Sequence, residues 1–152
     1  MAGAAMEVCP TDVILAPAER VWRLLTNPHE LAQWSGTKLV EGPARAVSAG
    51  DRLVFRKGML HITFDVLDMQ APRQLTLDIA LPFGVTLREQ IQIRPIDANS
   101  CRTTFNWAFS FPPGCRGRLL EMVFGRRFVT GPADALGRLK RAAEQRPIPP
   151  PD

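Results

Sequence analysis

One carboxylate falls where the sequence pattern predicts an apolar wall. Residues 85–93 alternate as a half-buried strand does, and Leu87, Ile91 and Ile93 share the parity that should face the interior. Glu89 has the same parity. Because an ionised carboxylate is costly inside an apolar wall unless it is paired or protonated, Glu89 is the first candidate for chemistry.

A partner for this carboxylate is sought in the basic C-terminal region. Arg127 lies on or beside the apolar face that Leu120, Phe124 and Phe128 form at helical spacing. We hypothesise that Glu89 and Arg127 meet inside a cavity or at its mouth and orient a polar group of a hydrophobic ligand. The alternative places Glu89 near a strand end in solvent and Arg127 at the surface.

Aromatic side chains gather in the next predicted strand, residues 101–111. Phe105, Trp107 and Phe109 share one parity, so we expect them to face the interior together. For any one of them, filling the core is the alternative to ligand contact. The predicted ligand-contact set is Phe55, Phe64, Leu77, Glu89, Phe105, Trp107, Phe109, Leu120, Phe124, Arg127 and Phe128.

Other chemically capable residues form no comparable pattern. His29 is predicted on a short helix and His61 on the outward face of a strand, so neither is an obvious catalytic group. Cys9, Cys101 and Cys115 are odd in number and lack metal-ligand spacing, which indicates reduced structural cysteines. No serine–histidine–aspartate arrangement, histidine-rich site or glycine-rich phosphate loop can be read from the spacing. We therefore expect neither a metal nor a cofactor.

Two helix starts near the N-terminus precede the strands. Pro17 fits the first turn of one helix, where its missing N–H is not needed. Asn27 is suited to be the N-cap of a second helix, with Pro28 at its first position and Glu30 where a capping box places a carboxylate. The sequence therefore predicts two short helices, the second of which ends near Trp34.

The strand pattern covers residues 8–15 and then most of the middle of the chain. Pro10 should limit pairing near the start of the first strand and place it at a sheet edge. The later predicted strands are residues 38–41, 52–57, 61–69, 74–81, 85–93 and 101–111, with breaks that include residues 95–100. Short links join antiparallel neighbours, whereas parallel strands need crossovers of about a dozen residues. The sheet is therefore antiparallel, and a nucleotide-binding α/β fold is not indicated.

After residue 114 the period becomes helical again. One apolar stripe links Leu120, Phe124, Phe128, Ala135, Leu139 and Ala142, in a segment that ends near Glu144. Gly131 and Pro132 should kink or restart this helix, because an interior proline loses a backbone hydrogen bond. Residues 147–152 form a proline-rich tail without a core-forming pattern.

Length and composition indicate the number of domains, the nature of possible partners and the expected location. The chain has 152 residues, which suits one domain, and a formal net charge of +4. Much of the basic excess lies near the C-terminus; it would allow weak attraction to nucleic acid or anionic lipid, but a solvated helix face is the favoured interpretation. No run approaches the roughly 20 apolar residues of a membrane span, and the N-terminus lacks a signal-peptide pattern, so a cytoplasmic location is expected.

The segments "APAERVWRLL", "NPHELAQW" and "GRLKRAAEQR", in this order of elements, resemble the START-like (Bet v 1-like, SRPBCC) superfamily. That superfamily includes polyketide cyclases, plant ligand carriers and Hsp90-activator-like domains, and the resemblance covers about residues 8–145. It implies an α+β helix-grip fold, in which a seven-stranded antiparallel sheet wraps around a long C-terminal helix and encloses a ligand cavity. The single domain would span residues 1–146.

Three classes of function stay open at this point. The favoured one is binding or transport of a hydrophobic or aromatic small molecule, lipid- or polyketide-like, in the cavity. The second is a polyketide cyclase or dehydratase, with Glu89 as the base and Arg127 or Arg88 stabilising an enolate oxygen. The third is an Hsp90-activator-like protein-interaction domain. We expect a hydrophobic small-molecule partner, no nucleic acid and no stable membrane insertion, and the resemblance allows a homodimer.

Overall fold

The structure, a computed structural model, describes residues 5–145, and these form one antiparallel sheet of eight strands with three α-helices. The strands are β1 (Ala5–Val8), β2 (Thr11–Ile14), β3 (Lys38–Glu41), β4 (Arg52–Lys57), β5 (Leu60–Gln70), β6 (Gln74–Ala80), β7 (Thr86–Asp97) and β8 (Ser100–Ser110). The helices are α1 (Ala18–Thr26), α2 (Pro28–Ser35) and α3 (Cys115–Glu144), with a 3-10 helix, η1 (Pro82–Gly84). The predicted tail, residues 147–152, lies outside the described residues.

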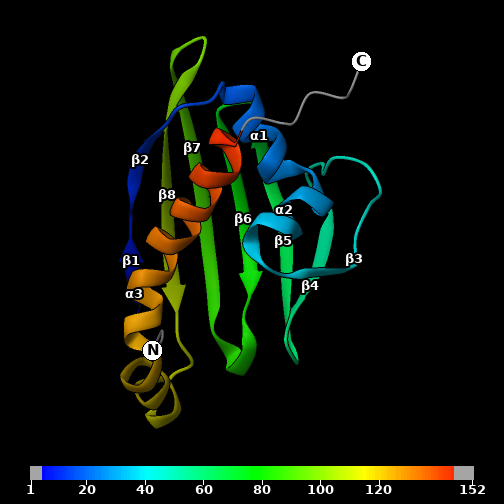
Figure 1. The fold of residues 1–152 in the computed structure, drawn as a ribbon. Helices are drawn as coiled ribbons and strands as arrows, with labels where there is room; N and C mark the ends of the chain where they lie inside the picture. Colours follow the sequence, from blue (N-terminus) through cyan, green and yellow to red (C-terminus); the bar gives the residue numbers. More distant parts are fainter. Residues whose placement is uncertain (1–4, 146–152) are drawn as a thin grey trace.

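The strand order is β1, β8, β7, β6, β5, β4, β3, and β2 also pairs with β8. The eight strands therefore occupy seven positions across the sheet. Figure 1 shows α3 running along one face of the curved sheet, with α1 and α2 beside its C-terminal half. The α+β prediction, with two short helices and a long C-terminal helix against an antiparallel sheet, is confirmed.

The first predicted strand, residues 8–15, is in fact two strands. Both β1 and β2 pair with β8 at the edge of the sheet, the place that Pro10 predicts. Pro10 has no N–H to contribute to the ladder, so pairing breaks around it. Its carbonyl oxygen still accepts a hydrogen bond from the Phe105 N–H at 2.9 Å, which keeps the chain close to β8 across the break.

The break predicted at residues 95–100 begins too early, because β7 continues through Pro95 to Asp97. The pairing of β6 with β7 ends at Gln74 and Gln92. Beyond that pair β7 has β8 as its strand neighbour, and the register shifts between Pro95 and Asp97. An irregular pairing with one neighbour tolerates the missing proline N–H, which a central strand would not.

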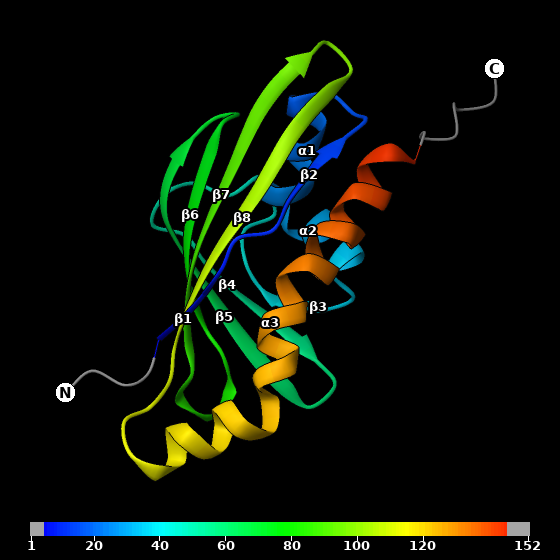
Figure 2. The same cartoon turned by 90° about the vertical axis from the view of Figure 1, so that its left-hand side faces the viewer.

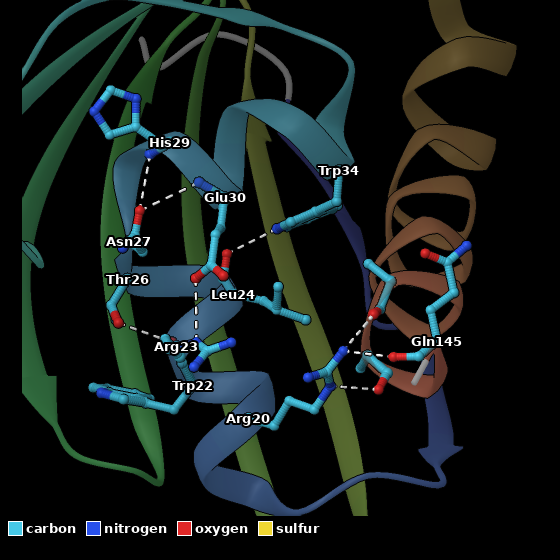
Figure 3. A network of polar contacts seen from close by, with 12 residues as sticks. Arg20, Trp22, Arg23, Leu24, Thr26, Asn27, His29, Glu30, Trp34 and Gln145 are labelled. Atoms are coloured by element: carbon cyan, nitrogen blue, oxygen red, sulfur yellow. Dashed lines mark hydrogen bonds and ion pairs between the residues drawn. The ribbon is translucent and has the colours of Figure 1, made fainter. Parts of the chain in front are cut away.

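The two N-terminal helices are separate because Asn27 both ends the first and caps the second. Its side-chain oxygen accepts hydrogen bonds from the N–H groups of His29, at 3.1 Å, and Glu30, at 3.3 Å (Figure 3). The indole Nε1 of Trp34 then donates to the carbonyl oxygen of Leu24 at 2.8 Å. This bond fixes the angle at which α2 folds back on α1.

Arg20 joins α1 to the end of α3. Its Nε donates to the carbonyl oxygen of Ala143 at 2.7 Å, and its Nη2 donates to those of Ala142, at 3.3 Å, and Gln145, at 2.6 Å (Figure 3). The last carbonyls of a helix have no partner within the helix and carry its negative dipole end. One guanidinium therefore satisfies the C-terminus of α3 and holds α1 against it.

The sequence predicts a kink or a restart at Gly131 and Pro132; the long helix is continuous through Pro132, so it does not restart there. Figure 2 shows α3 changing direction after its first, yellow part. The face that it turns to the core changes with it: the predicted stripe residues Ala135 and Ala142 are half-buried, while Leu136 and Ala143, one position on, are buried. Its buried residues are Gly117, Leu120, Pro132, Leu136, Leu139 and Ala143.

Candidate functional site

A cavity of about 660 Å³ lies between the sheet and the helices α2 and α3. Most of its wall is apolar and comes from strands β4 to β8, whose alternating side chains point toward α3. The apolar lining residues are Leu25, Leu31, Phe55, Ile62, Phe64, Leu75, Leu77, Ile79, Leu81, Leu87, Ile91, Phe109 and Ala135. The volume and the apolar wall are typical of small-molecule sites.

The structure brings most of the predicted ligand contacts to this cavity. Those that line it are Phe55, Phe64, Leu77, Glu89, Trp107, Phe109 and Arg127. Phe105, Leu120 and Phe124 do not line it. The side chain of Phe128 lies outside the described part of the chain.

The residues that miss the cavity pack elsewhere. Phe105 is 1% exposed and stacks on Trp107, with ring centroids 6.0 Å apart. Phe124 stacks on Phe83 of η1, with centroids 6.5 Å apart, and Leu120 is buried in the core. The first part of α3 therefore packs on the rim of the sheet, and its second part lines the cavity.

Glu89 lies in the wall at 5% exposure, beside Trp107 as its cross-strand neighbour on β8. None of the ion pairs formed within residues 5–145 includes it. Burial raises the pKa of the Glu89 carboxyl from 4.5 to about 8, and the Trp107 indole opposes this rise only in part. Glu89 is therefore mainly protonated at neutral pH and can donate a hydrogen bond.

Trp107 adds a second donor at the same place. Its Nε1 is buried, and within the described chain it makes no hydrogen bond of good geometry, although it lies near the Glu89 carboxyl. A buried donor that is left without an acceptor costs stability. Sequence parity predicted an aromatic wall here, but it gave no sign of an available N–H.

The predicted pairing of Glu89 with Arg127 is not formed. Both residues line the cavity, yet no ion pair joins them in the part of the chain that the structure describes. Arg127 is exposed on α3, at the rim, whereas Glu89 lies deep in the sheet. Arg88, the other predicted enolate stabiliser, is on the opposite face of β7 and is paired with Asp78. Within residues 5–145, no basic side chain forms an ion pair with Glu89 that would hold it ionised.

A polar rim on α2, β4 and α3 was missed by sequence reasoning. Its members are Trp34, Ser35, Thr37, Lys57, Arg127, Thr130, Asp134 and Arg138. Arg138 Nη1 donates to the carbonyl oxygen of Ser35 at 3.1 Å and so ties α3 to the end of α2 across this rim. Apart from Trp34, each of these residues has the sequence pattern of a solvated surface residue in its own segment, so no local signal could have grouped them.

The remaining candidates for chemistry lie outside the cavity. His29 and His61 are exposed, and the three cysteines are free, with Cys101 buried and Cys9 and Cys115 exposed. Residues 5–145 contain no group of three or more His, Cys, Asp or Glu side chains placed to hold a metal ion. In the same range, each helix is too short or too polar to cross a bilayer.

Comparison with known proteins identifies a matching family and similar folds. The family model for polyketide cyclase / dehydrase and lipid transport matches residues 8–144. No curated protein matches significantly. The solved structures that resemble the chain have low sequence identity to it, so the similarity shows the fold alone.

Three of those structures illustrate the range of proteins that share this fold. Truncated norcoclaurine synthase from Thalictrum flavum has a TM-score of 0.69 at 11% identity, over 97% of this chain and 98% of that one. DynU16, from the dynemicin biosynthetic locus, has a TM-score of 0.67 at 20% identity, over 91% of this chain and 47% of that one. The Aha1 dimer from Colwellia psychrerythraea has a TM-score of 0.66 at 18% identity, over 91% and 96%. This chain thus spans about half the length of DynU16.

Proposed function

The chain belongs to the polyketide cyclase/dehydrase and lipid-transport family, and from this premise we propose that it binds a hydrophobic small molecule in the cavity beneath α3. The observation that carries the proposal is a cavity of about 660 Å³ whose wall is apolar apart from the pair Glu89 and Trp107 and the polar rim. An apolar ligand body gains from contact with such a wall, and a few placed polar groups fix its orientation. The polar rim gives the ligand an entrance between α2 and α3.

Native mass spectrometry of protein purified from its own host tests this directly. We expect a bound mass in the range of a small organic molecule, released when the protein is denatured. A fluorescent apolar probe, 1-anilinonaphthalene-8-sulfonate, provides a second readout for the emptied protein. A protein that carries no adduct and does not enhance the fluorescence of this probe would not be a cavity binder.

Two alanines of α3 supply a matched pair of variants. Ala135 lines the cavity, so Ala135→Phe should fill part of it and weaken probe binding about tenfold or more. Ala133 is exposed on the same helix, so Ala133→Phe adds the same ring outside the cavity and should leave binding unchanged. Equal effects of both variants would place the probe elsewhere.

A cyclase- or dehydratase-type activity is the second candidate, and the state of Glu89 favours a specific version of it. With its pKa raised to about 8 by burial, this carboxyl suits a general acid or hydrogen-bond donor at neutral pH better than the general base expected from the sequence. Once a substrate is found, Glu89→Gln should lose turnover while it retains binding. Retained turnover would show that Glu89 is not the catalytic acid.

A further inference from the structure

The polar pair in the cavity restricts the class of ligand. Glu89 and Trp107 are directly opposed across β7 and β8, and both line the cavity. Glu89 is 5% exposed, and Trp107 Nε1 is buried without a hydrogen bond of good geometry inside the described chain. An indole N–H can only donate, and a buried carboxyl with no cation beside it holds a proton that it too can donate.

We propose that Glu89 and Trp107 form a two-donor site for a carbonyl oxygen, so that the ligand is a hydrophobic carbonyl compound such as an aryl ketone. This inference rests on the proposed binding function and specifies the ligand class for that same cavity. A carbonyl oxygen has two lone pairs and no proton, so it can accept from both donors at once. The apolar wall then contacts the rest of the ligand.

Other polar groups match this pair less well. An amine could take the proton of Glu89 and form an ion pair, but it would offer no acceptor to the indole N–H once protonated. A carboxylate would accept from both donors, but it would bring a net charge into an apolar wall, which is costly. The charged residues that share the cavity are Lys57 of β4 and Arg127, Asp134 and Arg138 of α3. None of these forms an ion pair with Glu89 in the described structure.

The same geometry gives a pH dependence with a definite sign. The carbonyl accepts from the protonated form of Glu89, whereas an ionised Glu89 would present lone pairs to the lone pairs of the ligand. Because burial raises the pKa of Glu89 to about 8, affinity should be constant at lower pH and should fall as the pH rises beyond about 8.

Two probes of nearly equal shape isolate the carbonyl: 2-acetylnaphthalene and 2-ethylnaphthalene, titrated by calorimetry at pH 6.5. We expect the ketone to bind roughly tenfold more tightly, as two net hydrogen bonds would give. Trp107→Phe, which keeps the ring and removes the N–H, should reduce this preference to about threefold. The double variant Glu89→Leu/Trp107→Phe should abolish it.

Trp22→Phe is the matched control. It makes the same ring change at a half-buried tryptophan of α1 that is not among the residues lining the cavity. This variant should keep the full ketone preference. Equal binding of both probes by the wild type would overturn the two-donor site and leave the cavity function standing. Binding of neither probe would overturn both.

A separate surface carries a second inference, independent of the cavity. The first part of α3 exposes apolar side chains at helical spacing: Leu119, Met122, Val123 and Val129 are each at least half exposed. Residues 115–130 also contain four arginines, Arg116, Arg118, Arg126 and Arg127, and a single acidic residue, Glu121. At 100° per residue the four apolar side chains lie within about 120° of one another. Arg118 borders this face on one side, Arg116 and Arg127 border it on the other, and Arg126 lies within it.

We infer that this apolar and basic face of α3 docks on an anionic lipid bilayer. An exposed apolar face with arginines along its borders and one, Arg126, within it matches a bilayer in both apolar and charged contacts, because an arginine can keep its head group in water while its stem lies along apolar surface. A second copy of the chain is a poorer occupant, because face-to-face pairing of this surface would set arginines against arginines. The adjoining Arg127, Thr130 and Gly131 line the cavity, so docking would bring its rim to the membrane.

Vesicle co-sedimentation tests this surface. We expect binding to vesicles of phosphatidylcholine with 30% phosphatidylglycerol, and weak binding to pure phosphatidylcholine or in 0.5 M salt. Met122→Glu/Val123→Glu should reduce binding about tenfold or more, whereas Met59→Glu, at an isolated site that is 95% exposed, should not. Absence of binding to anionic vesicles would overturn the inference. So would a dimer in sedimentation velocity that Met122→Glu/Val123→Glu dissociates, since that would assign the face to a second copy.

Discussion

Glu89 is held in the wall at a cost to folding, and this gives a prediction at the scale of one residue. Its carboxyl ionises near pH 4.5 when the chain is unfolded and near pH 8 in the fold. Between these values the unfolded state loses a proton that the folded state keeps, so rising pH favours unfolding. Glu89→Gln should therefore be more stable than the wild type at pH 7, by an amount on the order of a few kcal/mol.

Urea unfolding at pH 4, 5.5 and 7 measures this effect. The advantage of Glu89→Gln should be smallest at pH 4 and should grow as the pH rises toward 8. Glu7 is an exposed acid on β1, and Glu7→Gln serves as the control that should show no such trend. A Glu89→Gln curve parallel to the wild type would mean that Glu89 ionises equally in both states.

At the scale of one residue, the sequence predicts which face of a strand a side chain lies on better than it predicts which other side chains it contacts. Strand parity was enough to place Glu89 on the inner face. It could not show that Arg127 lies at the rim, because that depends on the path of α3 across the sheet. The available N–H of Trp107 is equally invisible, since it depends on which acceptors the fold leaves nearby.

At the scale of elements, the contact of Arg20 with the end of α3 should be a main source of stability for the helix layer. Arg20→Ala leaves the carbonyl oxygens of Ala142, Ala143 and Gln145 without this donor. We expect a loss of about 1–3 kcal/mol, measured by thermal or urea unfolding. Arg52→Ala is the control: it removes an arginine of β4 whose ion pair with Asp65 is exposed, so its loss should cost less than about 1 kcal/mol. If both variants lost the same free energy of unfolding, the contact of Arg20 with α3 would contribute no more to stability than an exposed ion pair.

The junction between α1 and α2 gives a second prediction at this scale. Asn27→Ala removes the acceptor for the N–H groups of His29 and Glu30 and should cost about 1 kcal/mol. Asn27→Ser, another good N-cap, should recover most of it. Circular dichroism melts of the three proteins measure the difference. If serine restored nothing, the role of Asn27 would lie outside the cap.

Element positions were predictable where local chemistry decides them. The caps at Asn27 and the alternation of β4 are short-range signals, and the structure confirms both. The extension of β7 through Pro95 was not predictable, because it depends on where the pairing with β6 ends. The face that α3 buries shifts after Pro132 for a similar reason: it follows the sheet, which is formed by distant segments.

At the scale of the whole molecule, the cavity links binding to stability. A ligand that binds the fold and not the unfolded chain stabilises it by mass action, about 2.7 kcal/mol at one hundred times its Kd. For a domain of this size that should raise Tm by about 5–10 °C. We therefore expect 2-acetylnaphthalene at saturation to raise the Tm of the wild type, measured by differential scanning calorimetry.

Two variants test whether this rise comes from the cavity. Ala135→Phe should show a much smaller rise in Tm, because Ala135 lines the cavity, while Ala133→Phe should match the wild type, because Ala133 faces solvent. If 2-acetylnaphthalene raised the Tm of Ala135→Phe as much as that of the wild type, the ligand would bind outside the cavity, and ligand binding in the cavity would not contribute to the stability of this fold.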